Sequence, residues 1–272
     1  MSPISDEAPG KRTRINTKMA HSARVHDYWL GGGNHFAADR FVADAVKTAY
    51  PGIVESVRAN RAFLARAVRF LAADAGITQF LDIGTGFPCA NNTHEVAQAV
   101  SHRARIVYVD YDPVVLLHAR TLLTSPHPET IDYIDADLRD PGVILSQAAR
   151  TLDLSRPVAI MLIAVMHLIV DNDDPYGIVN ALKAAMAPGS YLALSQVASD
   201  IEAEKVAEAR RTYNILARET QRHRTKDEVA RFFDGLHLVE PGLVPVQQWR
   251  PATIEEASAK STMWGGVAQA VR

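Results

Sequence analysis

The chain has 272 residues, of which 47% are hydrophobic, so it can bury one substantial core with room for an appendage. Its formal net charge of -2 gives no general reason to expect binding to nucleic acid or to an anionic membrane surface. The single cysteine, Cys89, excludes an internal disulfide framework and a multi-cysteine zinc site.

The first 20 residues are rich in Ser, Pro, Lys and Arg and hold few large apolar side chains. This composition predicts a disordered basic arm over residues 1–20, solvated rather than bound to nucleic acid. The arm has no hydrophobic core of a secretory signal, and no apolar run in the chain approaches the roughly 20 residues of a membrane span. We therefore expect a cytoplasmic protein that is not bound to a membrane.

Residues 24–34 read Arg-Val-His-Asp-Tyr-Trp-Leu-Gly-Gly-Gly-Asn. Such a mixture of aromatic, charged and glycine residues is typical of a loop or lid that touches a ligand, or of a linker whose aromatic side chains anchor it to the core. Helical patterns follow over residues 36–49 and 53–71. We predict that residues 21–76 form a helical lid, with Arg24 and Tyr28 near a cofactor or its reaction partner.

The second helical pattern carries four arginines beside its apolar stripe. Charged residues away from an apolar stripe are typical of a solvent-facing surface. We accordingly predict a solvated face for Arg58, Arg61, Arg66 and Arg69.

From residue 78 onwards, apolar strand patterns alternate with helical patterns. We predict strands at 79–84, 106–110, 131–135, 158–165, 191–197, 236–240 and 264–271, and helices at 93–101, 113–124, 141–151, 175–187, 201–221 and 226–233. This alternation predicts a doubly wound, mostly parallel seven-stranded sheet in a domain spanning residues 77–272. Such sheets bind ligands beyond the carboxyl ends of their strands.

The first predicted strand runs into a glycine turn, Phe80-Leu-Asp-Ile-Gly-Thr-Gly-Phe-Pro88. Gly84 and Gly86 let the backbone turn sharply and approach a ligand, with Thr85 between them. Asp82 stands two residues before the first glycine, where it would repel a pyrophosphate but attract an ammonium group. The turn therefore predicts a cationic nucleotide cofactor.

Acidic residues also end the next two predicted strands. Asp110, followed by Tyr111, is placed to accept hydrogen bonds from a ribose diol. Asp137 can accept from an adenine amino group, and the backbone N–H of Leu138 can reach a ring nitrogen. Two further acids, Asp112 and Asp140, each precede a proline and are predicted to be helix caps.

The fourth predicted strand leads into Ala164-Val-Met-His167. Ala164 and its apolar neighbours could cover a cofactor. His167 titrates near neutrality and is the candidate general base, the alternative being that it fixes the loop or packs against the cofactor. We expect no metal site, because the remaining histidines considered lack a metal-ligand spacing: His21, His26, His35, His94 and His102.

Together, these features resemble class I S-adenosylmethionine-dependent methyltransferases, with a Rossmann-like fold. Residues 182–190, Leu-Lys-Ala-Ala-Met-Ala-Pro-Gly-Ser, add the Pro-Gly turn before the fifth strand, and segments 23–32, 58–63 and 93–98 resemble an actinobacterial group once classed as a domain of unknown function. The resemblance implies S-adenosyl-L-methionine as cofactor and S-adenosyl-L-homocysteine as product. It implies cofactor contacts from Asp82, Gly84, Thr85, Gly86, Asp110, Tyr111, Asp137, Leu138 and Ala164.

One residue departs from the methyltransferase turn, since Pro88 stands where a third glycine is usual. We expect O- or N-methylation of a small-molecule acceptor. One alternative is a non-catalytic module that binds or senses the cofactor. The other is an NAD(P)-dependent oxidoreductase, but its dinucleotide-binding fingerprint requires a third glycine at the position of Cys89. The sequence leaves the oligomeric state open, a homodimer included.

Overall fold

The computed structural model describes residues 16–122 and 127–271, so the predicted basic arm lies outside it up to residue 15. At its centre is a sheet in the order β3-β2-β1-β4-β5-β8-β6, with β7 paired to β8. The strands are β1 (Gln79–Ile83), β2 (Arg105–Asp110), β3 (Ile131–Asp135), β4 (Ala159–Ile163), β5 (Tyr191–Val197), β6 (His237–Leu238), β7 (Val244–Pro245) and β8 (Met263–Gln269).

The sheet confirms the predicted doubly wound, mostly parallel architecture. β1 to β5 pair in parallel, and β8 runs antiparallel to β5. The order reverses at β1, whose neighbours are β2 and β4. Beyond the seven predicted strands, the two-residue β7 is too short to leave a period in the sequence. The reversal at β1 leaves a crevice at the carboxyl ends of the strands.

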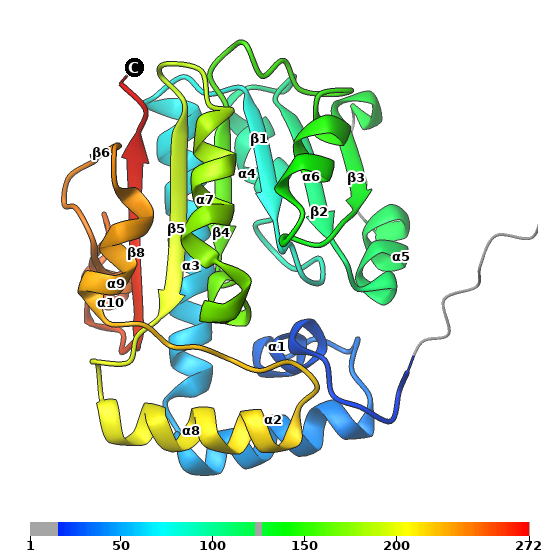
Figure 1. Ribbon diagram of the computed structural model, residues 1–272, viewed down its shortest axis with the longest axis vertical. Helices are drawn as coiled ribbons and strands as arrows, with labels where there is room; N and C mark the ends of the chain where they lie inside the picture. Colours follow the sequence, from blue (N-terminus) through cyan, green and yellow to red (C-terminus); the bar gives the residue numbers. More distant parts are fainter. Residues whose placement is uncertain (1–15, 123–126, 272) are drawn as a thin grey trace, which may run out of the picture.

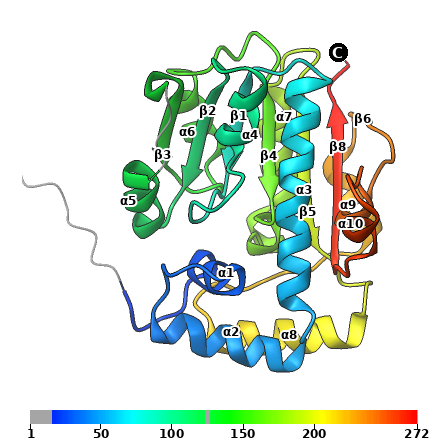
Figure 2. The ribbon, with the colours of Figure 1, turned by 180° about the vertical axis from the view of Figure 1, so that it is seen from behind.

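Helices cover both faces of the sheet and its carboxyl edge (Figures 1 and 2). No helix in the described part of the chain is long and apolar enough to cross a membrane. The helices are α1 (Ser22–Leu30), α2 (Ala37–Ala49), α3 (Ile53–Ala73), α4 (Thr93–Val100), α5 (Pro113–Leu122), α6 (Pro141–Ala148), α7 (Pro175–Ala184), α8 (Ala203–Leu216), α9 (Lys226–Ala230) and α10 (Ile254–Ser258).

The central strands are buried on both faces, which explains their nearly continuous apolar sequence. One face carries Leu81 and Ile83 against α6 and α7. The opposite face carries Phe80 and Met161 against α3 and α4. Residues of one strand thus alternate between two apolar cores, and this packing fixes the strand register at the carboxyl edge.

Residues 24–34, interpreted as a loop, a lid or a linker within the predicted helical lid, begin as a helix. In α1, Val25 and Trp29 lie four residues apart on one face and are buried against α2 and α8. The glycines end the helix, with Gly31 at φ 84° as its left-handed cap. Figure 1 shows α1, α2 and α8 facing the carboxyl edge of the sheet.

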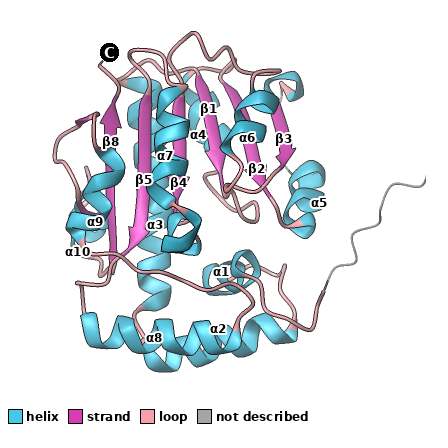
Figure 3. Cartoon of the chain, viewed as in Figure 1, coloured by secondary structure: helices cyan, strands magenta, loops and turns pink. Residues whose placement is uncertain are grey.

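The predicted helix over 201–221 ends earlier, at Leu216. Asn214 holds the chain that follows, because its Oδ1 accepts from the backbone N–H of Gln221 (2.8 Å) and its Nδ2 donates to the Gln221 carbonyl (3.1 Å). Figure 3 shows the connection from α8 to α9 as a loop that runs past α1. Residues 217–222 are thereby brought to the carboxyl edge of the sheet.

The solvated face predicted for the arginines of α3 is correct for Arg58 and Arg69, which are exposed. It is wrong for the other two. Arg66 donates to the carbonyls of Val246 (2.7 Å) and Trp249 (2.9 Å), and Arg61 donates to the loop after β1. A helix covered on several sides has little solvated surface, which periodicity alone does not reveal.

Candidate functional site

A pocket opens at the carboxyl ends of β1, β2, β3 and β4. Its walls come from the turns after these strands, from α1 and α3, and from residues 213–221. The predicted cofactor-contacting residues and the predicted base all line it: Asp82, Gly84, Thr85, Gly86, Asp110, Tyr111, Asp137, Leu138, Ala164 and His167.

The glycine turn after β1 requires both of its glycines. Gly84 has φ 76°, and a Cβ there would lie 2.4 Å from a methyl carbon of Val165. Gly86 has φ 65° and open space around it, so a glycine is favoured there by its backbone conformation and not by lack of space for a side chain. The backbone N–H of Gly86 donates to Oδ2 of Asp110 (2.9 Å), which ties the turn to the end of β2.

Asp82 is a buried carboxyl group that one side-chain donor reaches within the described residues. The hydroxyl of Thr93, at the start of α4, donates to its Oδ2 (2.6 Å). Burial raises the pKa of Asp82 to about 6, against the opposing effects of this hydrogen bond and of the positive charge on Arg61. A buried carboxylate with a raised pKa gains from a cationic ligand, which would replace the solvation that it has lost.

Asp110 and Asp112 are both buried but have different hydrogen-bond partners. Asp110 accepts from Gly86 N at one oxygen and from Asp112 N (2.9 Å) at the other. Burial raises the pKa of Asp110, although these two backbone donors oppose the shift. Asp112 accepts from Val114 N (2.8 Å) in the first turn of α5. Asp110 keeps lone pairs free for hydroxyl donors from the pocket.

Asp137 lies half-exposed at the end of β3, beside Arg139. Its Oδ1 accepts from the backbone N–H of Arg139 (2.9 Å) and from the guanidinium Nη1 (3.2 Å). Nε of the same arginine donates to Asp173 (2.9 Å), so one cation is shared by two acids. Asp140 caps α6 as predicted, accepting from Val143 N (3.1 Å).

His167 lies in a short 3-10 helix after β4 (Met166–Leu168) and shares the pocket wall with His26 of α1. Burial lowers the pKa of His167 to about 3, and the charges of His26 and Arg224 add to this effect. Burial and Arg61 lower the pKa of His26 to about 4. Both imidazoles are therefore neutral at pH 7, and Nδ1 of His167 has no hydrogen-bond partner among the described residues.

Arg24 and Tyr28 were expected to lie near the ligand, but their side chains point away from the pocket. Neither lines the pocket. Arg24 points to Asp39 of α2 and to Asp112, at 3.7 and 3.9 Å, while the Tyr28 hydroxyl donates to Asp44 (3.1 Å). Because successive helical residues point about 100° apart, the ligand side of α1 carries other residues of the same segment: His21, Ser22, Ala23, His26, Asp27, Trp29 and Leu30.

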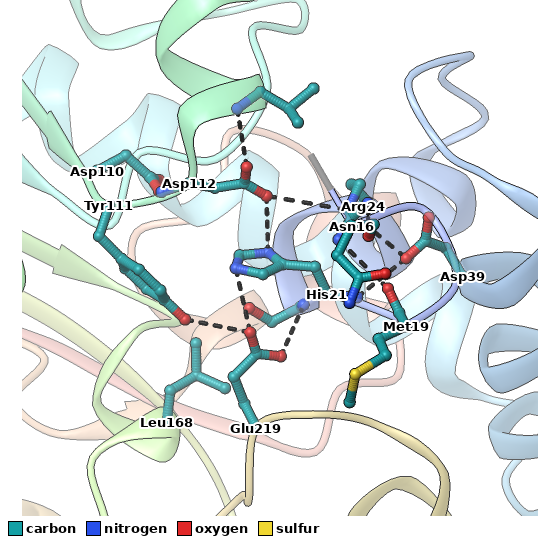
Figure 4. Close-up of polar contacts among 12 residues, drawn as sticks. Asn16, Met19, His21, Arg24, Asp39, Asp110, Tyr111, Asp112, Leu168 and Glu219 are labelled. Atoms are coloured by element: carbon teal, nitrogen blue, oxygen red, sulfur yellow. Dashed lines mark hydrogen bonds and ion pairs between the residues drawn. The ribbon is translucent and has the colours of Figure 1, made fainter. Parts of the chain in front are cut away.

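A polar network joins α1 to the pocket rim (Figure 4). His21 lies between two acids, with Nδ1 3.0 Å from Asp112 and Nε2 3.1 Å from Glu219. Glu219 also accepts from the Tyr111 hydroxyl (3.1 Å) and from Ser22 N (3.1 Å). From the sequence, His21 was considered only as a metal ligand, and no local pattern singles out Glu219. We refer to His21, Asp112, Tyr111 and Glu219 as the rim network.

Comparison with known proteins identifies relatives over nearly the whole chain. Residues 8–271 match a family described as S-adenosyl methyltransferase. A DUF574 family protein from Streptomyces avermitilis is 43% identical over 94% of this chain and 99% of its own, with a TM-score of 0.90. A putative methyltransferase from Thermobifida fusca is 40% identical over 93% and 95%, with a TM-score of 0.86. The chain matches none of the curated proteins compared with it.

Proposed function

Because the chain belongs to the S-adenosyl methyltransferase family, with S-adenosylmethionine as its cofactor, we propose that it methylates an oxygen or nitrogen of a small-molecule acceptor. One observation carries this proposal. The carboxylates that end three adjacent strands, Asp82, Asp110 and Asp137, line a single pocket together with a neutral histidine. The pocket thus offers both a cofactor site and a group for an acceptor.

The residues present fit the cofactor. Asp82 supplies a buried negative charge for the ammonium group, and Asp110 supplies acceptors for the ribose hydroxyls. Asp137 and the backbone of Leu138 would take the adenine edge. Bound S-adenosylmethionine supplies a methyl group on a positively charged sulfur, which is already activated for attack by a lone pair.

The chain's own residues have two further tasks, to orient the acceptor and to exclude water. Neutral His167 accepts a hydrogen bond from the O–H or N–H of the acceptor and thereby aims its lone pair. Bound S-adenosylmethionine would supply the methyl group, and His167 would hold the acceptor proton in this hydrogen bond until the proton leaves to water. The lid, residues 21–76, closes the pocket through α1.

The acceptor group matters for this step, because burial makes His167 a weak base with a pKa of about 3. A neutral amine is already nucleophilic and needs only orientation. A hydroxyl acceptor would demand more of His167 as its proton is lost. A low pKa therefore favours a role for His167 in hydrogen bonding over full proton abstraction in the resting pocket.

The test uses methyl-labelled S-adenosylmethionine with an actinobacterial extract as the source of acceptors. We expect label to move into a small-molecule fraction with the wild-type protein, and more slowly with Asp110→Ala at a cofactor concentration that does not saturate this variant. Labelled cofactor that binds but never transfers its methyl group would support a non-catalytic binding module instead. A protein that binds NAD(P) and not S-adenosylmethionine would support an oxidoreductase.

A further inference from the structure

The short 3-10 helix that carries His167 is held from outside by a fully buried arginine. Arg224 belongs to the connection between α8 and α9 and is 0% exposed. Its Nη1 donates to the Met166 carbonyl (2.9 Å) and its Nη2 to the Ile169 carbonyl (2.9 Å). Because a guanidinium is a rigid, planar fork, these two hydrogen bonds fix the backbone on both sides of His167.

The backbone of this connection is itself bonded to the sheet. The N–H of Arg224 donates to the carbonyl of Val197, the last residue of β5 (3.2 Å). Two residues earlier, the N–H of Arg222 donates to the His167 carbonyl (2.7 Å). We refer to residues 222–224 as the strap. The strap thus ties the turn after β4 to the carboxyl end of β5.

The buried guanidinium has a cost that packing alone does not explain. Nε of Arg224 has no hydrogen-bond partner among the described residues, and the acid that pairs with Nη2, Asp171 (3.0 Å), is 59% exposed. Cζ of Arg224 lies 5.5 Å from the ring centroid of Phe232. An apolar side chain of similar length would cover the same ring without desolvating a charge. Such a side chain could not donate to the two carbonyls of the turn.

The imidazole of His167 depends on its backbone for its direction. Its Nδ1 has no hydrogen-bond partner within the described part of the chain, so this atom does not anchor the ring. His167 lines the pocket, whereas Arg224 does not. Arg224 therefore acts on the pocket through the turn, and not by touching a ligand.

We propose that Arg224 is a positioning residue for methyl transfer, which holds the turn after β4 so that the His167 imidazole faces the acceptor. This inference rests on the proposed function, in which His167 orients the acceptor. A shift of the turn would misalign the acceptor and the methyl group without removing a cofactor contact. The charge of Arg224 works in the same direction, since it helps to lower the pKa of His167 and keeps the imidazole neutral.

Two variants separate the fork from the charge. Arg224→Met removes the charge and both donors at a similar length, while Arg224→Lys keeps a positive charge without the fork. The first measurement is amide hydrogen exchange of Leu168 and Ile169, whose N–H groups donate to carbonyls within the turn. We expect exchange about tenfold faster or more in both variants, as for the loss of a hydrogen bond, with β1 and β4 unchanged. Arg224→Lys also serves as the second variant if Arg224→Met does not fold.

The second measurement is an NMR titration of the His167 ring. The titratable or charged groups that act on this ring are His26 of α1 and His223 and Arg224 of the strap. Arg224→Met removes a positive charge and lets water reach the turn, and both changes favour protonation of His167. Its titration midpoint should rise by about one unit or more above the value of about 3, so that the ring signals begin to move near pH 5. Arg224→Lys should raise it less.

The third measurement is transfer of labelled methyl groups into the extract at saturating S-adenosylmethionine. Both variants should transfer about tenfold more slowly or worse, while their affinity for S-adenosylhomocysteine stays within about twofold of wild type. Arg231→Met, at an exposed arginine just after α9, is the matched control and should leave all three measurements unchanged.

Unchanged exchange and titration in both variants would overturn the positioning role and leave the proposed function intact. Equal losses of transfer and of S-adenosylhomocysteine affinity would also overturn it, because Arg224 would then support the pocket as a whole. Full transfer by Arg224→Lys would overturn the role of the fork. A wild-type protein that binds the cofactor but transfers no label would overturn the proposed function, and with it the link from Arg224 to methyl transfer.

Discussion

The imidazole Nδ1 of His21 lies 3.0 Å from Oδ2 of Asp112, two residues after the predicted ribose acid Asp110. Burial lowers the pKa of His21, but the hydrogen bond with Asp112 and the charges of Glu219 and Asp112 outweigh it, so the net pKa is raised. Asp112 responds in the opposite sense, with its pKa lowered although burial acts to raise it. His21, which takes up a proton more readily than a free imidazole, thus links α1 to the edge of the cofactor pocket.

This link predicts that docking of α1 depends on pH. A histidine whose folded pKa is raised stabilises the docked state fully below about pH 6.5 and loses this contribution as pH rises through the folded pKa. Hydrogen exchange of the α1 amides, corrected for intrinsic rates, should therefore quicken as pH rises above neutrality. Two acids, Asp112 and Glu219, face His21 directly, and Arg24 of the same helix opposes its charge.

His21→Gln is the matched variant for this experiment. It keeps a side chain that can hydrogen-bond but cannot become charged, so α1 exchange should be faster than in the wild-type protein at pH 6. The difference between the two proteins should shrink towards pH 9. A constant difference over this range would show that His21 anchors α1 without its charge.

Removing the carboxylate of Asp110 should weaken binding of the cofactor. Asp110→Ala loses the ribose acceptors and frees two backbone N–H groups, those of Gly86 and Asp112. We expect S-adenosylhomocysteine binding to fall by about 1–3 kcal/mol in calorimetry. Asp135→Ala is the control, because Asp135 ends the neighbouring strand but is exposed and does not line the pocket. Unchanged affinity of Asp110→Ala would remove Asp110 from the cofactor site.

The positions of Asp110 at the pocket and of Asp112 at a helix start were predictable because both depend on local sequence order. An acid at the end of a parallel strand faces the crevice, and an acid before a proline caps the next helix. The five parallel strands were predictable for a similar reason, since their apolar runs alternate with segments of helical periodicity in the sequence. Local pattern thus located the pocket and three of its acids.

The opposite wall of the pocket was not predictable in this way. Arg61 shares a helix with exposed arginines, and only the fold of residues 87–92 decides that its guanidinium meets carbonyls. Glu219 reaches His21 across 198 residues of sequence, through a loop whose exit from α8 depends on Asn214. Such contacts follow from tertiary packing, and the hydrophobic periodicity of a single sequence does not report tertiary contacts.

The histidine of the predicted catalytic step should stay neutral over the physiological range. Burial lowers the pKa of His167 to about 3, so its imidazole signals in an NMR titration should not move between pH 8 and pH 5. His167→Gln identifies the resonance of His167 in these spectra. A midpoint near 6.5 for His167 would show a solvated imidazole and restore it as an ordinary general base.

Asp82 should make cofactor affinity depend on pH in the opposite sense from the α1 link. Its pKa of about 6 belongs to the protein without ligand, and a bound ammonium lowers it. S-adenosylhomocysteine should therefore bind with full affinity above pH 6 and progressively more weakly below it, as Asp82 takes up a proton. The affinity of 5′-methylthioadenosine, which lacks the ammonium, should not follow this change.

The buried carboxylate of Asp82 should lower the stability of the folded protein while it strengthens ligand binding. A carboxyl whose folded pKa is raised costs the folded state stability as pH rises from about 4 to about 6, and two units correspond to about 3 kcal/mol. Asp82→Asn removes that cost and keeps an oxygen for the Thr93 hydroxyl. Urea denaturation at pH 8 should therefore show a free energy of unfolding up to about 3 kcal/mol higher, while S-adenosylhomocysteine affinity falls. A less stable Asp82→Asn protein would mean that the carboxylate is already compensated within the fold, and its role as counter-charge to the ligand would fail.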